Sequence, residues 1–294
     1  MIYNILLSIT HHYDQPAAHG RQLIRVLPKT IPGRQQLNTH LLEVSPFPNR
    51  RVEGVDFFGN SVLTCTHSAP HEDLGISLTC HVAMTPPLPL TDLSPSMASL
   101  RADWQKARDL SPSSPLHFLG PTARLISDPD IASFAKAASD PTASVTENVI
   151  RLGEALHAAM TFDNAATTVD TDASEAFRMR RGVCQDFAHI MILGLQSLGI
   201  PAGYVSGYLR TLPPEGAEKL EGVDAMHAWV KAWCGVAQGW IEYDPTNRTL
   251  IGTDHIVVGY GRDYSDVAPV RGRLRSSGGQ SSTQAVDVAI VNAA

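Results

Sequence analysis

One cysteine stands where a polypeptide can make its thiol reactive. Cys184 follows Gly182 and opens an apolar run, residues 187–198, whose spacing predicts a helix. A thiol in the first turn of a helix lies near the positive end of the helix dipole, which favours the thiolate. Gly182 permits close backbone contact at this point. Three basic side chains just upstream could favour the thiolate as well: Arg178, Arg180 and Arg181.

A thiolate nucleophile needs a base, and the base needs a group that orients it. His227 lies in an alternating run, residues 226–234, that predicts a strand. Asp244 ends the next predicted strand, residues 240–243, and lies 17 residues after His227. That spacing accommodates two neighbouring antiparallel strands and their turn, so the imidazole and the carboxylate can meet across the pair.

These three residues predict acyl-transfer chemistry through a covalent intermediate. His227 would take the proton of Cys184, the thiolate would attack an amide or peptide carbonyl, and Asp244 would hold the imidazole in one tautomer. Backbone N–H groups at the start of the helix would stabilise the oxyanion. An ordinary structural role also fits each residue: a core cysteine, a packed strand histidine and a turn-forming aspartate before Pro245.

Several ordered segments between about residues 171 and 269 resemble the motifs of bacterial transglutaminase-like proteins. The nucleophile motif is matched by residues 181–189 (RGVCQDFAH), the histidine motif by 225–230 (AMHAWV) and the aspartate motif by 240–247 (WIEYDPTN). Further matches are residues 198–202 (LGIPA), 204–208 (YVSGY) and 261–267 (GRDYSDV). Residues 13–16 (YDQP) and 56–60 (DFFGN) resemble the β-domain that precedes this core in the family.

The resemblance implies a papain-like core, in which a nucleophile helix packs on an antiparallel sheet, with Cys184, His227 and Asp244 as the triad. The family includes protein cross-linking enzymes, cysteine proteases or amidases, and peptide-removing glycanases. Because bacterial members of this kind often look more like hydrolases, we expect a protease or amidase acting on a peptide or protein amide. The alternative is a non-catalytic scaffold or partner-binding module that retains the fold. No cofactor is expected.

Secondary candidates surround this core. Three residues are candidates to line the substrate cleft or support the oxyanion: Gln185, Tyr208 and Trp229. For Asp186 and His189 we favour helix capping and a satisfied core histidine over a role in the chemistry. Arg262, Asp263 and Tyr264 are interpreted as a structural ion-pair and hydrogen-bond cluster. A zinc site is not expected among Cys65, His67, His71, Cys80 and His81, because their spacing fits no zinc-finger pattern.

The elements that must position these residues divide the chain into three parts, and the fold class expected is α+β. Residues 1–85 contain short β-rich runs separated by turn signals, which predict a β-sandwich-like domain. Residues 86–143 form a Pro-rich and helical connector, with helix starts at Ser94 and Asp128. Residues 144–294 form the catalytic core, in which Ser144 and Glu147 make a capping box, and end in a hairpin tail.

Composition excludes several other functions. The chain has 294 residues, with 23 Lys and Arg against 29 Asp and Glu, a net charge of −6. Such a chain, without a basic block, is a poor nucleic-acid binder. The sequence shows no convincing signal peptide and no apolar run that could span a membrane, so a cytoplasmic protein is expected. The 4 cysteines do not form a disulfide framework. The oligomeric state stays open.

Overall fold

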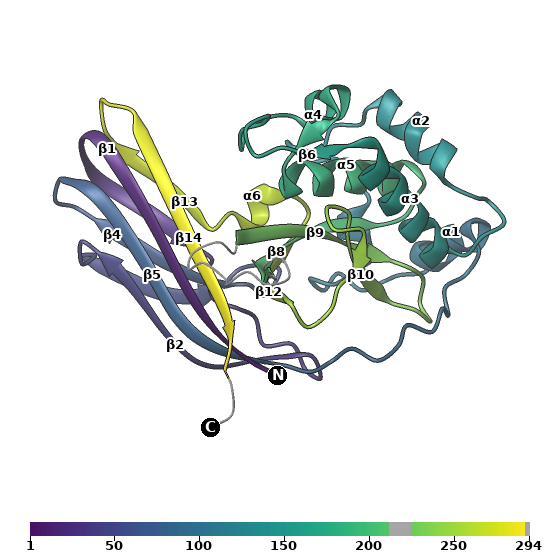
Figure 1. Ribbon diagram of the computed structural model, residues 1–294, viewed down its shortest axis with the longest axis horizontal. Coiled ribbons are helices and arrows are strands. Elements are labelled where there is room, and N and C mark those ends of the chain that lie inside the picture. The colour runs from purple at the N-terminus through teal and green to yellow at the C-terminus, as the bar shows by residue number, and fades with distance from the viewer. Residues whose placement is uncertain (212–224, 292–294) are drawn as a thin grey trace, which may run out of the picture.

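The computed structural model describes residues 1–211 and 225–291. It has a β-rich part, on the left in Figure 1, and a helical part built around a second sheet, on the right. The α+β class predicted from the sequence is confirmed. The loop expected at residues 211–224 lies, after residue 211, outside the described residues. Within the described ranges, no helix is long and apolar enough to cross a membrane.

The longest strand, β1 (Ile2–Ile24), organises the β-rich part. Buried and more exposed side chains alternate along most of it, so one face of the strand points to the core. Its first half pairs with β5 (His71–Met84), which pairs in turn with β2 (Gln35–Ser45). Its second half pairs with β4 (Ser61–His67), which pairs with β3 (Arg50–Val55). Side chains from both halves of β1 meet in one apolar core.

The C-terminal strands correct the expectation of a hairpin tail on the catalytic core. Both β13 (Val270–Arg275) and β14 (Gln280–Ile290) pair antiparallel with β1, β14 along its first half and β13 along its second. Each is antiparallel to the part of β1 that it pairs with, and Figure 1 shows both strands in the β-rich part. The long edge of β1 offers more backbone hydrogen bonds than a short hairpin would. The tail belongs to the β-rich part.

The helical part begins with the connector. The helices are α1 (Met97–Gln105), the short 3-10 helix η1 (Pro115–Phe118), α2 (Pro129–Ala138), α3 (Val145–Ala159), α4 (Ala173–Met179), α5 (Cys184–Ser197) and α6 (Tyr264–Val267). Asp128 caps α2, and Ser144 and Glu147 form the predicted capping box of α3. Ser94 does not cap α1, whose N-cap is Ser96. The Ser94 hydroxyl instead accepts a hydrogen bond from the backbone of Thr146.

Five strands form the sheet of the helical part. In spatial order they are β11 (Thr249–Leu250), β10 (Trp240–Asp244), β9 (Ala225–Trp233), β8 (Ala202–Leu209) and β12 (His255–Gly261), and a separate parallel pair joins β6 (Thr161–Phe162) to β7 (Arg181–Gly182). Helix α5 covers one face of the five-stranded sheet, where Ala228, Val230 and Ala232 join its apolar core. The alternating residues of β9, including His227 and Trp229, face the other way.

The β-rich part seals the open edge of β12. The buried Gln35 side chain accepts the Val257 N–H at 2.8 Å and donates to the Val257 carbonyl at 2.7 Å. Asn60 makes the same pair of bonds with Tyr260, at 2.8 and 2.7 Å. The Lys29 N–H adds a bond to the Val257 carbonyl at 2.9 Å. Two side-chain amides thus replace a neighbouring strand, and they join the two parts of the chain.

The Gln35→Leu substitution tests this seam. Leucine is of similar size but cannot make the two hydrogen bonds of the Gln35 amide to the Val257 N–H and carbonyl. The free energy of unfolding should therefore fall by about 2–4 kcal/mol. The measurement is urea denaturation followed by circular dichroism. Gln36→Leu is the matched control, because Gln36 is exposed and bonds only its neighbour Leu37. Equal stability of the two variants would contradict the role of Gln35.

Candidate active site

Cys184 is the first residue of α5, directly after the two-residue strand β7. The Asp186 carboxylate accepts the Val183 N–H at 2.8 Å and the Thr167 hydroxyl at 2.7 Å, which fixes the first turn of the helix. A Cβ on Gly182 would lie 2.5 Å from an Asp186 oxygen, so this close turn requires glycine. The interpretation of Asp186 as a helix-capping residue is confirmed.

The upstream arginines are engaged elsewhere. The Arg180 guanidinium lies 3.9 Å from the centre of the Phe177 ring. Arg181 pairs with Asp163 at 3.4 Å. The expectation that these cations favour the Cys184 thiolate directly therefore finds no support in their contacts, and the helix start and the imidazole are the groups left to do so.

His227 and Asp244 meet as their spacing predicts. His227 Nε2 lies 2.7 Å from Asp244 Oδ2, and only 7% of the His227 surface and none of the Asp244 surface is exposed. A carboxylate only accepts hydrogen bonds, so Nε2 carries the proton. Cys184 lies close enough to this imidazole to raise its pKa. Since Nε2 faces Asp244, Nδ1 is the ring nitrogen left to act as a base.

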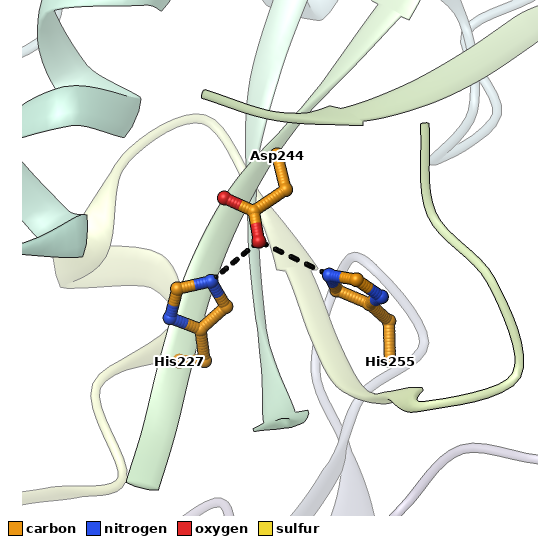
Figure 2. Close-up of side chains that lie close together, drawn as sticks. All are labelled: His227, Asp244 and His255. Atoms are coloured by element: carbon orange, nitrogen blue, oxygen red, sulfur yellow. Dashed lines mark hydrogen bonds and ion pairs between the residues drawn. The ribbon is translucent and has the colours of Figure 1, made fainter. Parts of the chain in front are cut away.

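Two further residues complete the surroundings of Asp244. Asn247 Nδ2 donates to Oδ2 at 2.7 Å, and His255 Nε2 lies 3.0 Å from the same oxygen. The backbone N–H groups of Thr246 and Asn247 donate to Oδ1 at 2.9 and 3.2 Å. Figure 2 shows the two imidazoles on either side of the carboxylate. Asn247 lay within the aspartate motif without a role assigned to it, and His255 was not recognised from the sequence at all.

The charges of this group support one another. Burial lowers the pKa of His227, but its interactions with Cys184 and with the hydrogen-bonded Asp244 carboxylate outweigh burial and raise it to about 10. Burial would raise the pKa of Asp244, yet the hydrogen bonds from His227 and His255 hold it well below its usual range. The Asp244 carboxylate therefore stabilises a positive charge on the His227 imidazole.

The two imidazoles and the carboxylate are also side chains of the kind that bind metal ions. Ligand atoms of His227, Asp244 and His255 all lie within 4.8 Å of one another. A tetrahedral zinc ion bound at about 2.0–2.1 Å would separate its ligand atoms by about 3.3 Å. Here the Asp244 oxygen lies 2.7 and 3.0 Å from the two nitrogens, which are hydrogen-bond distances. The geometry is that of a proton-bearing network.

The side chains of the three secondary candidates are hydrogen-bonded or buried. The Gln185 amide donates to the Val169 carbonyl at 3.0 Å. Tyr208 has no exposed surface, and its hydroxyl donates to the Val26 carbonyl at 2.7 Å, which places it in the core between the two parts of the chain. Trp229 is also fully buried. The proposed places of Tyr208 and Trp229 on a cleft surface do not fit this burial.

The structural interpretations of the closing segment are confirmed. His189 is buried, accepts the Tyr264 N–H at 3.2 Å, and its pKa is lowered to about 4 by burial. Arg262 pairs with Asp266 at 2.8 Å, and Asp263 caps α6. These contacts brace α6 against α5 and β8, at a distance from the His227–Asp244 pair.

Comparison with known proteins matches both parts of the chain. Residues 3–83 match the bacterial transglutaminase-like N-terminal region, and residues 132–245 match the transglutaminase-like superfamily. An uncharacterized protein of Mycobacterium tuberculosis strain H37Rv is 34% identical over 268 residues, covering 87% of this chain and 82% of the relative. An uncharacterized protein of Mycobacterium leprae strain TN is 31% identical over 270 residues, covering 91% of each.

Among solved structures, a proposed cysteine protease from Cytophaga hutchinsonii has a similar fold. The TM-score is 0.76 at 22% sequence identity, and the match covers 100% of this chain and 92% of that chain. The likeness therefore includes the β-rich part as well as the helical part.

The Cys184→Ala substitution tests the coupling of the thiol to His227. Without the thiolate, burial is opposed by Asp244 alone, so the pKa of His227 should fall from about 10 by about 1–3 pH units. An NMR titration of the His227 imidazole measures it. The control is Cys234→Ala, which removes a buried thiol that bonds the Ala232 carbonyl. An unchanged titration in both variants would contradict the coupling.

Proposed function

The chain belongs to the transglutaminase-like superfamily, and from this premise we propose that it is a thiol-dependent acyl hydrolase or acyltransferase acting on amide or peptide bonds. The observation that carries the proposal is the buried His227–Asp244 hydrogen bond beside Cys184 at the start of a helix. Cys184 is the nucleophile, His227 the general base and acid, and Asp244 the group that orients His227.

The first half-reaction forms a thioester. His227 Nδ1 takes the thiol proton, and Cys184 Sγ attacks the carbonyl carbon of the substrate amide. As the tetrahedral intermediate collapses, the C–N bond breaks and the proton on Nδ1 passes to the departing nitrogen, which leaves as an amine or ammonia. The Asp244 carboxylate stabilises the imidazolium throughout and does not take its proton.

The oxyanion of this intermediate needs donors near the sulfur. The first N–H groups of a helix have no intrahelical acceptor, so those of Cys184 and Gln185 are free of the helix ladder. They lie at the positive end of the α5 dipole, where negative charge is stabilised. Because the Gln185 amide is bonded to Val169, these backbone groups are the better candidates.

The second half-reaction releases the acyl group. Water, activated by neutral His227, attacks the thioester, the C–S bond breaks and a carboxylate leaves with regeneration of the thiol. An amine in place of water would give a new amide. We favour water, and so a protease or amidase, because bacterial proteins with this N-terminal region resemble hydrolases more than cross-linkers. A similar fold in a proposed cysteine protease is consistent with that choice.

Iodoacetamide labelling at pH 6 tests the nucleophile. An ordinary thiol is less than about 1% ionised there, whereas a thiolate–imidazolium pair is ionised, so Cys184 should react at least about tenfold faster than in the urea-unfolded chain. His227→Ala should reduce the labelling rate of Cys184 to that of the unfolded chain. His40→Ala, which removes an exposed histidine of β2, should leave the native labelling rate unchanged. The readout is the labelling rate by peptide mass spectrometry. A native rate no faster than the unfolded rate would instead favour the non-catalytic scaffold.

A second experiment separates hydrolysis from transfer. Glutamine-containing peptides are incubated with the protein and a fluorescent amine, and products are followed by mass spectrometry. We expect new carboxyl groups, from cleaved peptide bonds or deamidated glutamine, with little amine incorporation, and no reaction with Cys184→Ser. Predominant amine incorporation would replace the hydrolase assignment with a transferase.

A further inference from the structure

His255 reaches the candidate site from a strand that is not next to the one carrying His227. It begins β12, and β8 lies between β12 and β9. The position of β8 opposite His227 is Gly207, where a Cβ would lie 2.3 Å from the Trp229 ring and 2.2 Å from the Ile256 carbonyl. The missing side chain at Gly207 leaves space in which groups from β9, β10 and β12 meet.

The His255 ring is held in one tautomer by its two hydrogen bonds. The Gly252 N–H donates to His255 Nδ1 at 3.4 Å, so Nδ1 is an acceptor and the ring proton is on Nε2. That Nε2–H points at Asp244 Oδ2, 3.0 Å away. Nδ1 of His255 is therefore engaged by the backbone, and Nε2–H is the group that His255 offers to Asp244.

The two imidazoles on Asp244 are therefore not equivalent. Each uses Nε2 to bond the same carboxylate oxygen, as Figure 2 shows. His227 keeps Nδ1 for the Cys184 thiol, whereas Nδ1 of His255 is occupied by Gly252. Only His227 can accept the proton of the thiol.

The packing of His255 keeps its ring in place. The Trp229 ring meets it edge to face, with the ring centres 5.3 Å apart and the planes at 81°. Trp229 is fixed in turn, since its indole N–H donates to Glu242 at 2.7 Å and Glu242 is bound by Arg34 at 2.6 Å. A network that begins in the β-rich part thus ends on the His255 ring.

From this geometry we propose that His255 is a positioning residue: it aims the Asp244 carboxylate at His227 as an Nε2–H donor and does not itself carry the transferred proton. The inference rests on the proposed function of Cys184 and His227. Without His255, Oδ2 of Asp244 would lose one of its three side-chain donors. The buried carboxylate could then rotate towards the Asn247 amide and away from His227. The imidazolium of His227 would then lose part of its stabilisation.

The other charged groups near His255 are already paired. His227 and Asp244 face it from β9 and β10, and Glu242 lies behind Trp229. The preceding residue, Asp254, accepts the Tyr3 hydroxyl at 2.8 Å and pairs with Arg210 at 3.2 Å. The pH response at this position should therefore come from His227 and Cys184.

Two amide substitutions of His255 make a matched test. In His255→Gln the side-chain amide can occupy the place of Nε2 and donate to Asp244, whereas in His255→Asn the shorter amide occupies the place of Nδ1 and cannot. We expect His255→Asn to lower the iodoacetamide labelling rate of Cys184 at pH 6 by about tenfold. The rise of the labelling rate with pH should also shift to higher pH. His255→Gln should recover most of the wild-type rate and profile.

The control for loss of any buried histidine is His67→Asn. His67 is buried in the β-rich part, where it bonds Gln22 and the Pro46 carbonyl. This variant should lose stability but keep the wild-type labelling profile. A wild-type profile in His255→Asn, or an equal defect in His255→Gln and His255→Asn, would overturn the positioning role.

An NMR measurement tests the inference independently of thiol reactivity and of variant folding. In ¹⁵N-labelled wild-type protein, the His255 ring should carry its proton on Nε2, and Nδ1 should show the chemical shift of a nitrogen that accepts a hydrogen bond. A His255 ring protonated at Nδ1 would refute it. If Cys184 shows no excess reactivity in the wild type but His255 shows the expected tautomer, the proposed function fails and the positioning of Asp244 stands.

Discussion

A fully buried carboxylate is the constraint around which this structure is arranged. Removing the Asp244 charge from water costs several kcal/mol unless hydrogen bonds compensate. The protein supplies five: two from the backbone of the turn after β10, one from the Asn247 amide and one from each of two imidazoles. These donors come from two strands and a turn, and Asp244 itself ends a third strand. The start of β9, the end of β10 and the start of β12 must therefore lie close together before the charge can be held.

The two faces of the five-stranded sheet that brings these strands together differ in chemical character. One face is apolar and packs on α5, the helix that begins with Cys184. The other face carries polar side chains that are buried all the same. Lys231 lies among the rings of Phe118, Trp240 and Tyr260, and burial lowers its pKa to about 7. A sheet with a buried polar face needs a second layer over that face, and the β-rich part and the connector provide it.

Several features of the fold and of the candidate site could be predicted from the sequence, because they depend on residues that are close together in the chain. The capping box at Ser144 and the alternation in β9 depend on neighbours within a few residues, and the pairing of His227 with Asp244 depends on one tight turn. His255 was missed because its contact requires three strands in a particular order and an empty position at Gly207. The tail was misplaced for a similar reason, since its partner β1 lies at the other end of the sequence.

The same long-range contacts argue that the β-rich part is a component of the site rather than an attached module. Gln35 and Asn60 close the edge of β12, the strand that carries His255. Arg34 binds the Glu242 carboxylate that also holds Trp229 against His255. The last described strands then return to pair with β1. Because the groups that hold β12 and Trp229 come from the β-rich part, the orientation of the Asp244 carboxylate depends on both parts.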